Sequence, residues 1–119
     1  NKYSDIVNKI SINRIKKNNI SDSEKLKNVT TEYDYLYSIV FDELKIEESD
    51  FYNLVLINEK LWDIEDKLRD KERDKSFDND FIELARSVYF TNDKRAEIKK
   101  EINLKYGSLF VEEKSYKEY

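Results

Sequence analysis

The fold is decided by two stretches of equal length, residues 26–40 (LKNVTTEYDYLYSIV) and residues 54–68 (LVLINEKLWDIEDKL). In each stretch, apolar residues recur at alternating steps of three and four, which places them along one stripe of an α-helix. The stripes are Leu26, Val29, Tyr33, Leu36 and Val40 in the first stretch and Leu54, Ile57, Leu61, Ile64 and Leu68 in the second. Narrow stripes of this kind are typical of helices packed on helices. We therefore predict that the two stretches form an antiparallel, coiled-coil-like hairpin.

The composition of the whole chain also favours helices. The 119 residues include no proline and one glycine, while 40% are charged and 39% are hydrophobic. Proline and glycine are the residues that interrupt helices, and charge-rich helical patterns are typical of long helices and coiled coils. A chain of this length suits one domain. We predict a single all-α domain over residues 1–119.

Short helices are expected to pack on the hairpin. The expected helices cover residues 5–19, 21–44 with Ser21 as the cap, 51–74, 81–90 and 92–106. Ser21 and Glu24 match a capping box at the start of the second helix. Asn92 and its neighbours are good N-cap residues, so a new helix is expected to start there. Gly107 is expected to end that helix in the left-handed conformation, and residues 109–111 are predicted to form a C-terminal extended clasp or short strand.

Missing residue types exclude several chemistries. The chain has no cysteine and no histidine, which excludes disulfides, zinc sites built from these residues and a Ser-His relay. Any enzyme would have to use carboxylate, lysine or tyrosine as its acid or base. The formal net charge of −4 argues against general nucleic-acid binding, which needs a basic surface. No apolar run is long enough for a membrane span and no secretory signal is visible, so we expect a cytoplasmic protein.

Metal motifs are also absent. The acidic pair at residues 47–48 lacks the following glutamates that helical pyrophosphohydrolases use to hold magnesium. Asp78 and Asp80 have the spacing that opens a calcium loop, but the loop glycine and the closing glutamate are missing. We therefore predict no metal and no cofactor.

Eight residues of the second half are candidate ligand-binding residues. They are Asn58, Trp62, Glu65, Arg86, Tyr89, Asn92, Arg95 and Lys99. Steps of three and four place Asn58, Trp62 and Glu65 on one helical face beside the second stripe. Two interpretations remain open for this face: Trp62 stacks on a sugar or base, or it packs against a neighbouring helix.

The other five candidates are polar residues grouped around the helix start expected at Asn92. Arg86 and Tyr89 share one helical face, as do Arg95 and Lys99. Donors near a helix start suit an anionic small molecule such as a phosphate. The alternative is that these cations pair with acids of the same chain.

Charge is distributed unevenly along the sequence. Residues 32–50 are strongly acidic, whereas residues 9–17 and 94–105 are basic. Blocks of opposite sign attract each other within one fold or between subunits. Because two narrow stripes supply little core, we expect a homo-oligomer in which a second copy adds buried surface.

The second half of the chain resembles a family of short, uncharacterised bacterial and phage proteins, a domain of unknown function. The resemblance is carried by residues 58–66, 81–89, 92–99, 102–103, 107–108 and 112–116. The first helix fits this family more loosely, since Asn8 stands where the family carries an acid. Genes of the family often lie near lipopolysaccharide or other surface-glycan biosynthesis genes. The resemblance therefore implies an association with glycan biosynthesis but no particular reaction.

The sequence favours a non-enzymatic, self-associating interaction or scaffold protein. The first alternative is a protein that binds a sugar or nucleotide-sugar, which requires Trp62, Arg86 and Arg95 to converge on an open pocket. The second is a magnesium-dependent hydrolase, which requires at least three converging carboxylates.

Overall fold

The protein is helical throughout the part that the structure, a computed structural model, describes. Residues 2–107 are described, 88% of them are helical, and none of them lies in a strand. The elements are α1 (Lys2–Asn19), α2 (Ser23–Tyr37), the π-helix η1 (Ser38–Glu43), α3 (Glu48–Asp74) and α4 (Asn79–Lys105). The predicted all-α fold is confirmed, whereas the predicted clasp lies outside the described residues.

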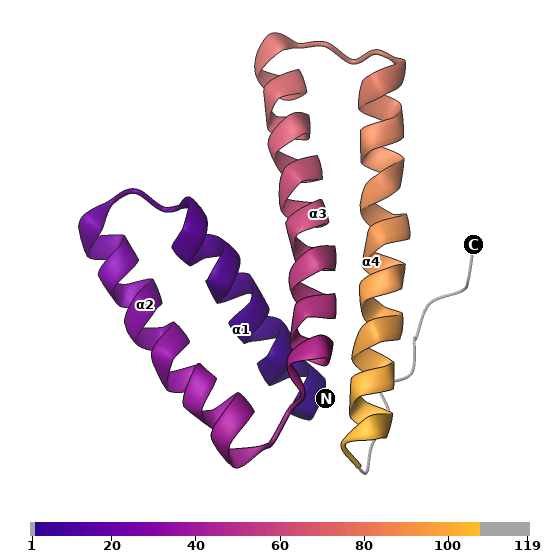
Figure 1. Ribbon diagram of the computed structural model, residues 1–119. Helices are drawn as coiled ribbons and strands as arrows, with labels where there is room; N and C mark the ends of the chain where they lie inside the picture. The colour runs from indigo at the N-terminus through magenta and orange to yellow at the C-terminus, as the bar shows by residue number, and fades with distance from the viewer. Residues whose placement is uncertain (1, 108–119) are drawn as a thin grey trace.

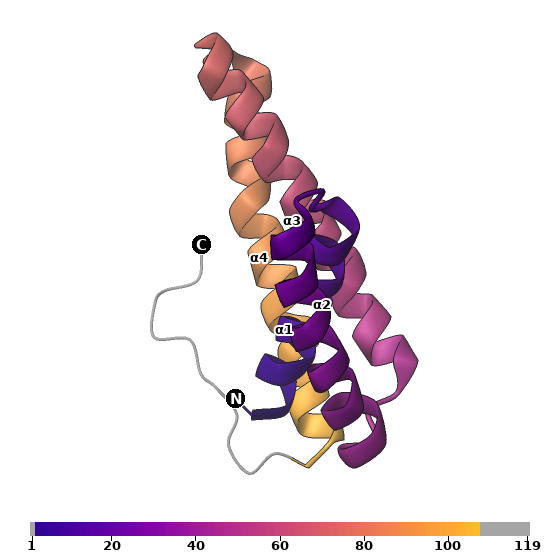
Figure 2. The same cartoon turned by 90° about the vertical axis from the view of Figure 1, so that its left-hand side faces the viewer.

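The helices form two antiparallel hairpins that lie at an angle to each other (Figure 1). One hairpin is α1 with α2, and η1 continues the line of α2. The other is α3 with α4, which have 27 residues each. Helix α1 is the central element, because it packs against α2 and also against both α3 and α4. The far half of the α3–α4 hairpin extends well beyond α1 and α2, as Figures 1 and 2 both show.

The predicted pairing of the two apolar stripes is wrong. Within the described residues, the stripe of α2 packs on α1, and the stripe of α3 packs on α1 and α4. The stripes pack on α1 because this helix has an apolar face of its own, on which Val7 and Ile10 are completely buried. This face is broad enough to lie between the two stripes and cover both. Near the short link that joins η1 to α3, the Phe41 and Phe51 rings, which belong to neither stripe, contact edge to face at 5.4 Å between centroids.

The two short helices predicted after residue 80 are in fact one long helix, α4. Thr91 is buried in the middle of this helix, and neither it nor Asn92 caps a helix. Cap-forming residues permit a helix start but do not impose one, since no glycine or proline interrupts the chain here. The equally long α3 offers α4 a continuous partner, and packing against it keeps the helix intact.

Side-chain caps lie at the starts of α2 and α4, whereas α3 begins after Glu47 without one. Asp22, rather than Ser21, caps α2 and accepts hydrogen bonds from the amides of Glu24 and Lys25, both at 3.0 Å. Asp78 caps α4 by accepting from the amide of Phe81 at 3.0 Å. At the other end of α4, Gly107 has a φ of +76°, which confirms the predicted left-handed helix end.

Two leucines of α3 provide a test of this packing. Leu54 is completely buried between helices, whereas Leu56, two residues later, is 65% exposed. We expect Leu54→Ala to lower the free energy of unfolding by about 2–5 kcal/mol, because the cavity that it leaves cannot collapse fully. Leu56→Ala, the matched control, should change it by less than about 0.5 kcal/mol. Urea denaturation measures both, and equal losses would contradict the described core.

Candidate functional site

A buried polar network lies where α1 packs against α3 and α4. Its centre is Asn58 of α3, which is 4% exposed. The Asn58 amide nitrogen donates to the side-chain oxygen of Asn8 and to the hydroxyl of Ser11, both at 2.8 Å. The Ser11 hydroxyl in turn donates to the backbone carbonyl of Asn8 at 2.7 Å. The network therefore joins one side chain of α3 to two consecutive turns of α1.

Arg95 of α4 completes this network. Its guanidinium donates to the side-chain oxygen of Asn58 and to that of Asn92, both at 2.9 Å. Burial lowers the pKa of Arg95, and the nearby charge of Glu65 opposes that effect. No carboxylate of residues 2–107 comes within ion-pair distance of Arg95, so amide oxygens are its direct partners.

The structure thus brings together three of the eight predicted site residues, namely Asn58, Asn92 and Arg95, with Glu65 close enough for its charge to act on Arg95. Asn8 and Ser11, which lie on α1, were not among the predicted site residues. Their spacing of three was a usable signal, because it places two small polar side chains on one face of α1, next to the apolar Val7 and Ile10. Buried hydrogen-bonded networks of this kind fix the relative positions of helices.

The other predicted residues have different partners. Lys99 forms an ion pair with Asp5 of α1 at 3.0 Å. The exposed Arg86 places its guanidinium 5.8 Å from the centroid of the Phe90 ring, and Tyr89 also contacts that ring. The cations predicted to share one anion site therefore bind three different groups.

Trp62 faces the far end of α1. It is half-buried and lines a cleft of about 320 Å³ whose other lining residues are Ile15, Asn18, Asn19 and Glu59. Neither Arg86 nor Arg95 lines this cleft. The convergence of Trp62, Arg86 and Arg95 that a nucleotide-sugar pocket requires is therefore not seen.

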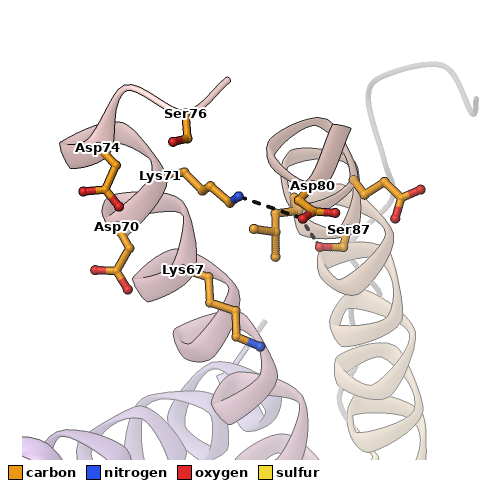
Figure 3. A pocket seen from close by; sticks show the side chains of 9 residues that line it. Lys67, Asp70, Lys71, Asp74, Ser76, Asp80 and Ser87 are labelled. Atoms are coloured by element: carbon orange, nitrogen blue, oxygen red, sulfur yellow. Dashed lines mark hydrogen bonds and ion pairs between the residues drawn. The ribbon is translucent and has the colours of Figure 1, made fainter. Parts of the chain in front are cut away.

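A larger cleft, of about 620 Å³, lies between the end of α3 and the start of α4 (Figure 3). Lys71 lies in it and binds Asp78 at 3.0 Å, with Asp80 at 4.0 Å. The side chains of Asp70 and Asp74 point away from α4 in this view. Among residues 2–107, no group of three acidic side chains is placed to hold a metal ion.

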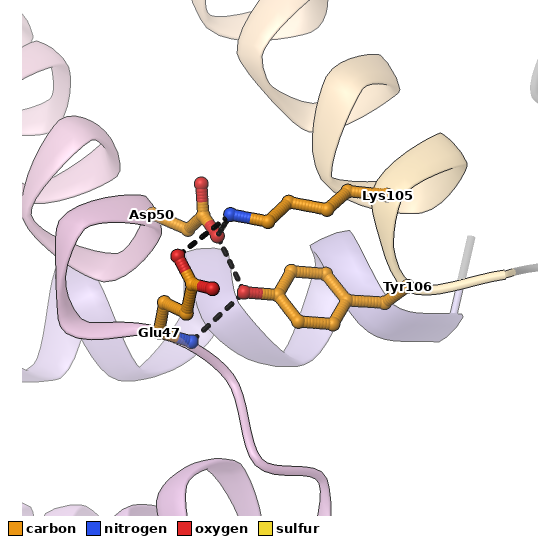
Figure 4. Close-up of polar contacts among 4 residues, drawn as sticks. All are labelled: Glu47, Asp50, Lys105 and Tyr106. Atoms are coloured by element: carbon orange, nitrogen blue, oxygen red, sulfur yellow. Dashed lines mark hydrogen bonds and ion pairs between the residues drawn. The ribbon is translucent and has the colours of Figure 1, made fainter.

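A second polar cluster ties the end of α4 to the start of α3 (Figure 4). The Lys105 ammonium binds the carboxylates of Glu47 at 2.8 Å and Asp50 at 2.9 Å. The Tyr106 hydroxyl donates to Asp50 and accepts from the Glu47 amide at 2.8 Å. Burial and the hydrogen bond to Asp50 raise the pKa of Tyr106. Each polar group of the cluster has a partner within it, so the cluster acts as a fastener between helix ends.

Comparisons with family models, curated proteins and solved structures find no match to this chain. Within the described part of the chain, no helix is both long and apolar enough to cross a bilayer.

The buried network can be tested with two asparagines of α3. Asn58→Ala leaves Arg95, Asn8 and Ser11 without a shared partner, so we expect a loss of about 1–3 kcal/mol in the free energy of unfolding. Asn53→Ala alters an exposed position of the same helix and should cost less than about 0.5 kcal/mol. The comparison uses urea denaturation, and a neutral Asn58→Ala would show that the network adds no stability.

The hydrogen bonds of the Tyr106 hydroxyl should make the free energy of unfolding depend on pH in the alkaline range. Tyr106→Phe removes both hydrogen bonds of the hydroxyl, at a cost of about 1 kcal/mol at neutral pH. Because the pKa of Tyr106 is raised above 10.0 in the folded state, its stabilising contribution is present below pH 10 and is lost as pH rises through the raised value. The difference between Tyr106→Phe and wild type should therefore shrink above pH 10. Tyr35→Phe, at an exposed tyrosine of α2, is the control and should show neither effect.

Proposed function

We propose that the protein is a non-enzymatic scaffold that self-associates through the outer half of the α3–α4 hairpin, residues 65–90, here called the arm. The observation that carries the proposal is the incomplete burial of apolar residues on the two arm helices. Leu68, Leu84 and Val88 are only half-buried, because no other described helix covers the hairpin there. A two-helix layer has no third element to complete its core, and a second arm would supply one.

Two further features support pairing of the arm with a second copy. Phe77 and Ile82 at its tip are 55% and 52% exposed, although both are large apolar side chains. The charges of α3 in the arm are of mixed sign and already paired along the helix, as in Asp66 with Arg69 at 2.7 Å and Asp70 with Arg73 at 3.2 Å. Such a surface presents no block of like charge to repel its own copy. A two-fold arrangement of arms uses the same surface on both partners.

Sedimentation of two matched variants tests this proposal. At micromolar concentration we expect the wild type to have a mass near twice 14.4 kDa. Ile82→Glu introduces a charge on the arm and should give a monomer, because burying that charge in the interface is unfavourable. Leu104→Glu changes a residue of the same helix that is 60% exposed but lies outside the arm, and should remain dimeric.

Both substituted residues are exposed, so the helical circular dichroism of the two variants should match that of the wild type. A wild type that stays monomeric throughout the micromolar range would refute self-association. Equal dissociation by the two variants would place the interface outside the arm.

A further inference from the structure

The cleft beside Trp62 is lined by the side chain of this tryptophan and by one carboxylate, that of Glu59. Helices α1 and α3 diverge here, so that the last turn of α1 stands away from the middle of α3 (Figure 1). The cleft measures about 320 Å³, which is near the lower end for small-molecule sites. We propose that it binds a small organic ammonium ion.

The aromatic contribution comes from the only tryptophan of the chain. Trp62 is half-buried, so packing holds its indole ring while part of it faces the cleft. The face of an indole ring carries negative electrostatic potential and attracts cations more strongly than the ring of tyrosine or phenylalanine. It favours weakly hydrated cations such as alkylammonium ions.

Three negative or electron-rich groups belong to residues that line the cleft with Trp62. Glu59 lies on the same helix, and it makes no ion pair with any of residues 2–107. Helix α1 ends at Asn19, so the negative end of its dipole lies at the cleft. The Asn19 side-chain nitrogen donates to the carbonyl of Ile15 at 2.7 Å, which leaves the amide oxygen of Asn19 as an acceptor.

The basic residues of α1 are directed elsewhere. The Arg14 guanidinium lies 5.2 Å from the centroid of the Tyr52 ring, and the Lys17 ammonium lies 4.9 Å from that of Tyr33. The pKa of Glu32 on α2 is lowered by its hydrogen bond to Lys9 and, more weakly, by the charge of Lys16. None of these cations lines the cleft, so Glu59 is its only charged lining residue.

The same features select against other ligands. A single carboxylate is too few for a divalent metal ion, which binds several oxygen ligands. An anion would meet the Glu59 carboxylate and the negative end of the α1 dipole, which both repel it. An ammonium group that carries alkyl substituents can contact the Trp62 side chain and pair with the Glu59 carboxylate at the same time.

Fluorescence of Trp62 reports directly on the cleft, because no other tryptophan contributes to it. The probe is choline chloride, titrated at constant ionic strength against sodium chloride. We expect a saturable change in Trp62 emission in the millimolar range with choline. Glucose, as a neutral polyol of similar size, should produce no saturable change.

Two variants and a control test whether negative charge in the cleft strengthens choline binding. Glu59→Gln should weaken choline binding about threefold, the range expected for an exposed charge pair. Asn18→Asp adds a carboxylate to the cleft and should strengthen binding by a similar factor. Glu97→Gln removes an exposed acid of α4 that does not line the cleft and should leave binding unchanged.

The proposal is overturned if choline produces no saturable change, or if glucose saturates the signal and choline does not. It is also overturned if Glu59→Gln binds choline as tightly as the wild type does. Because Glu59 and Asn18 are exposed, neither substitution removes a core contact, and circular dichroism verifies that each variant is folded.

Discussion

Burial of the apolar face of α1 is the interaction on which the rest of the structure depends. Val7 and Ile10 are completely buried in a core to which α2, η1, α3 and α4 all contribute. Without α1, the stripes of α2 and α3 would have no common surface, and the angle between the two hairpins would not be fixed. The single central helix also explains how a chain with 39% hydrophobic residues forms a core, since one helix contacts the stripes of both α2 and α3.

The buried polar network adds specificity to this apolar contact. Hydrophobic packing tolerates sliding of one helix along another, whereas the bonds from Asn58 to Asn8, Ser11 and Arg95 are satisfied in only one register. Arg95 is held by amide oxygens, which match its donors without burying a second charge. The fastener of Lys105 and Tyr106 then fixes the other end of α4 to the start of α3.

The arm and the Trp62 cleft are consequences of the same geometry. Helix α1 has 18 residues, whereas α3 and α4 have 27 each, so the longer hairpin extends past the end of α1. Beyond that point the arm has no cover from α1 and α2, which is the basis of the proposed self-association. At that point the divergence of α1 from α3 opens the cleft, where the helix C-terminus, Glu59 and Trp62 meet.

The sequence by itself determined that the chain is helical, because periodicity and the lack of proline are local properties that need no partner. It also determined that the two stripes would be inward-facing, and Leu36, Val40, Leu54 and Ile57 are indeed buried. It did not determine which helix each stripe contacts, since a stripe reveals only that a partner exists. In the tertiary structure, α1 lies between the stripes and α4 is continuous through Thr91. Asn58 and Arg95, which are 37 positions apart in the sequence, form a hydrogen bond. Those outcomes depend on competition among all the apolar and polar faces at once, which no local pattern encodes.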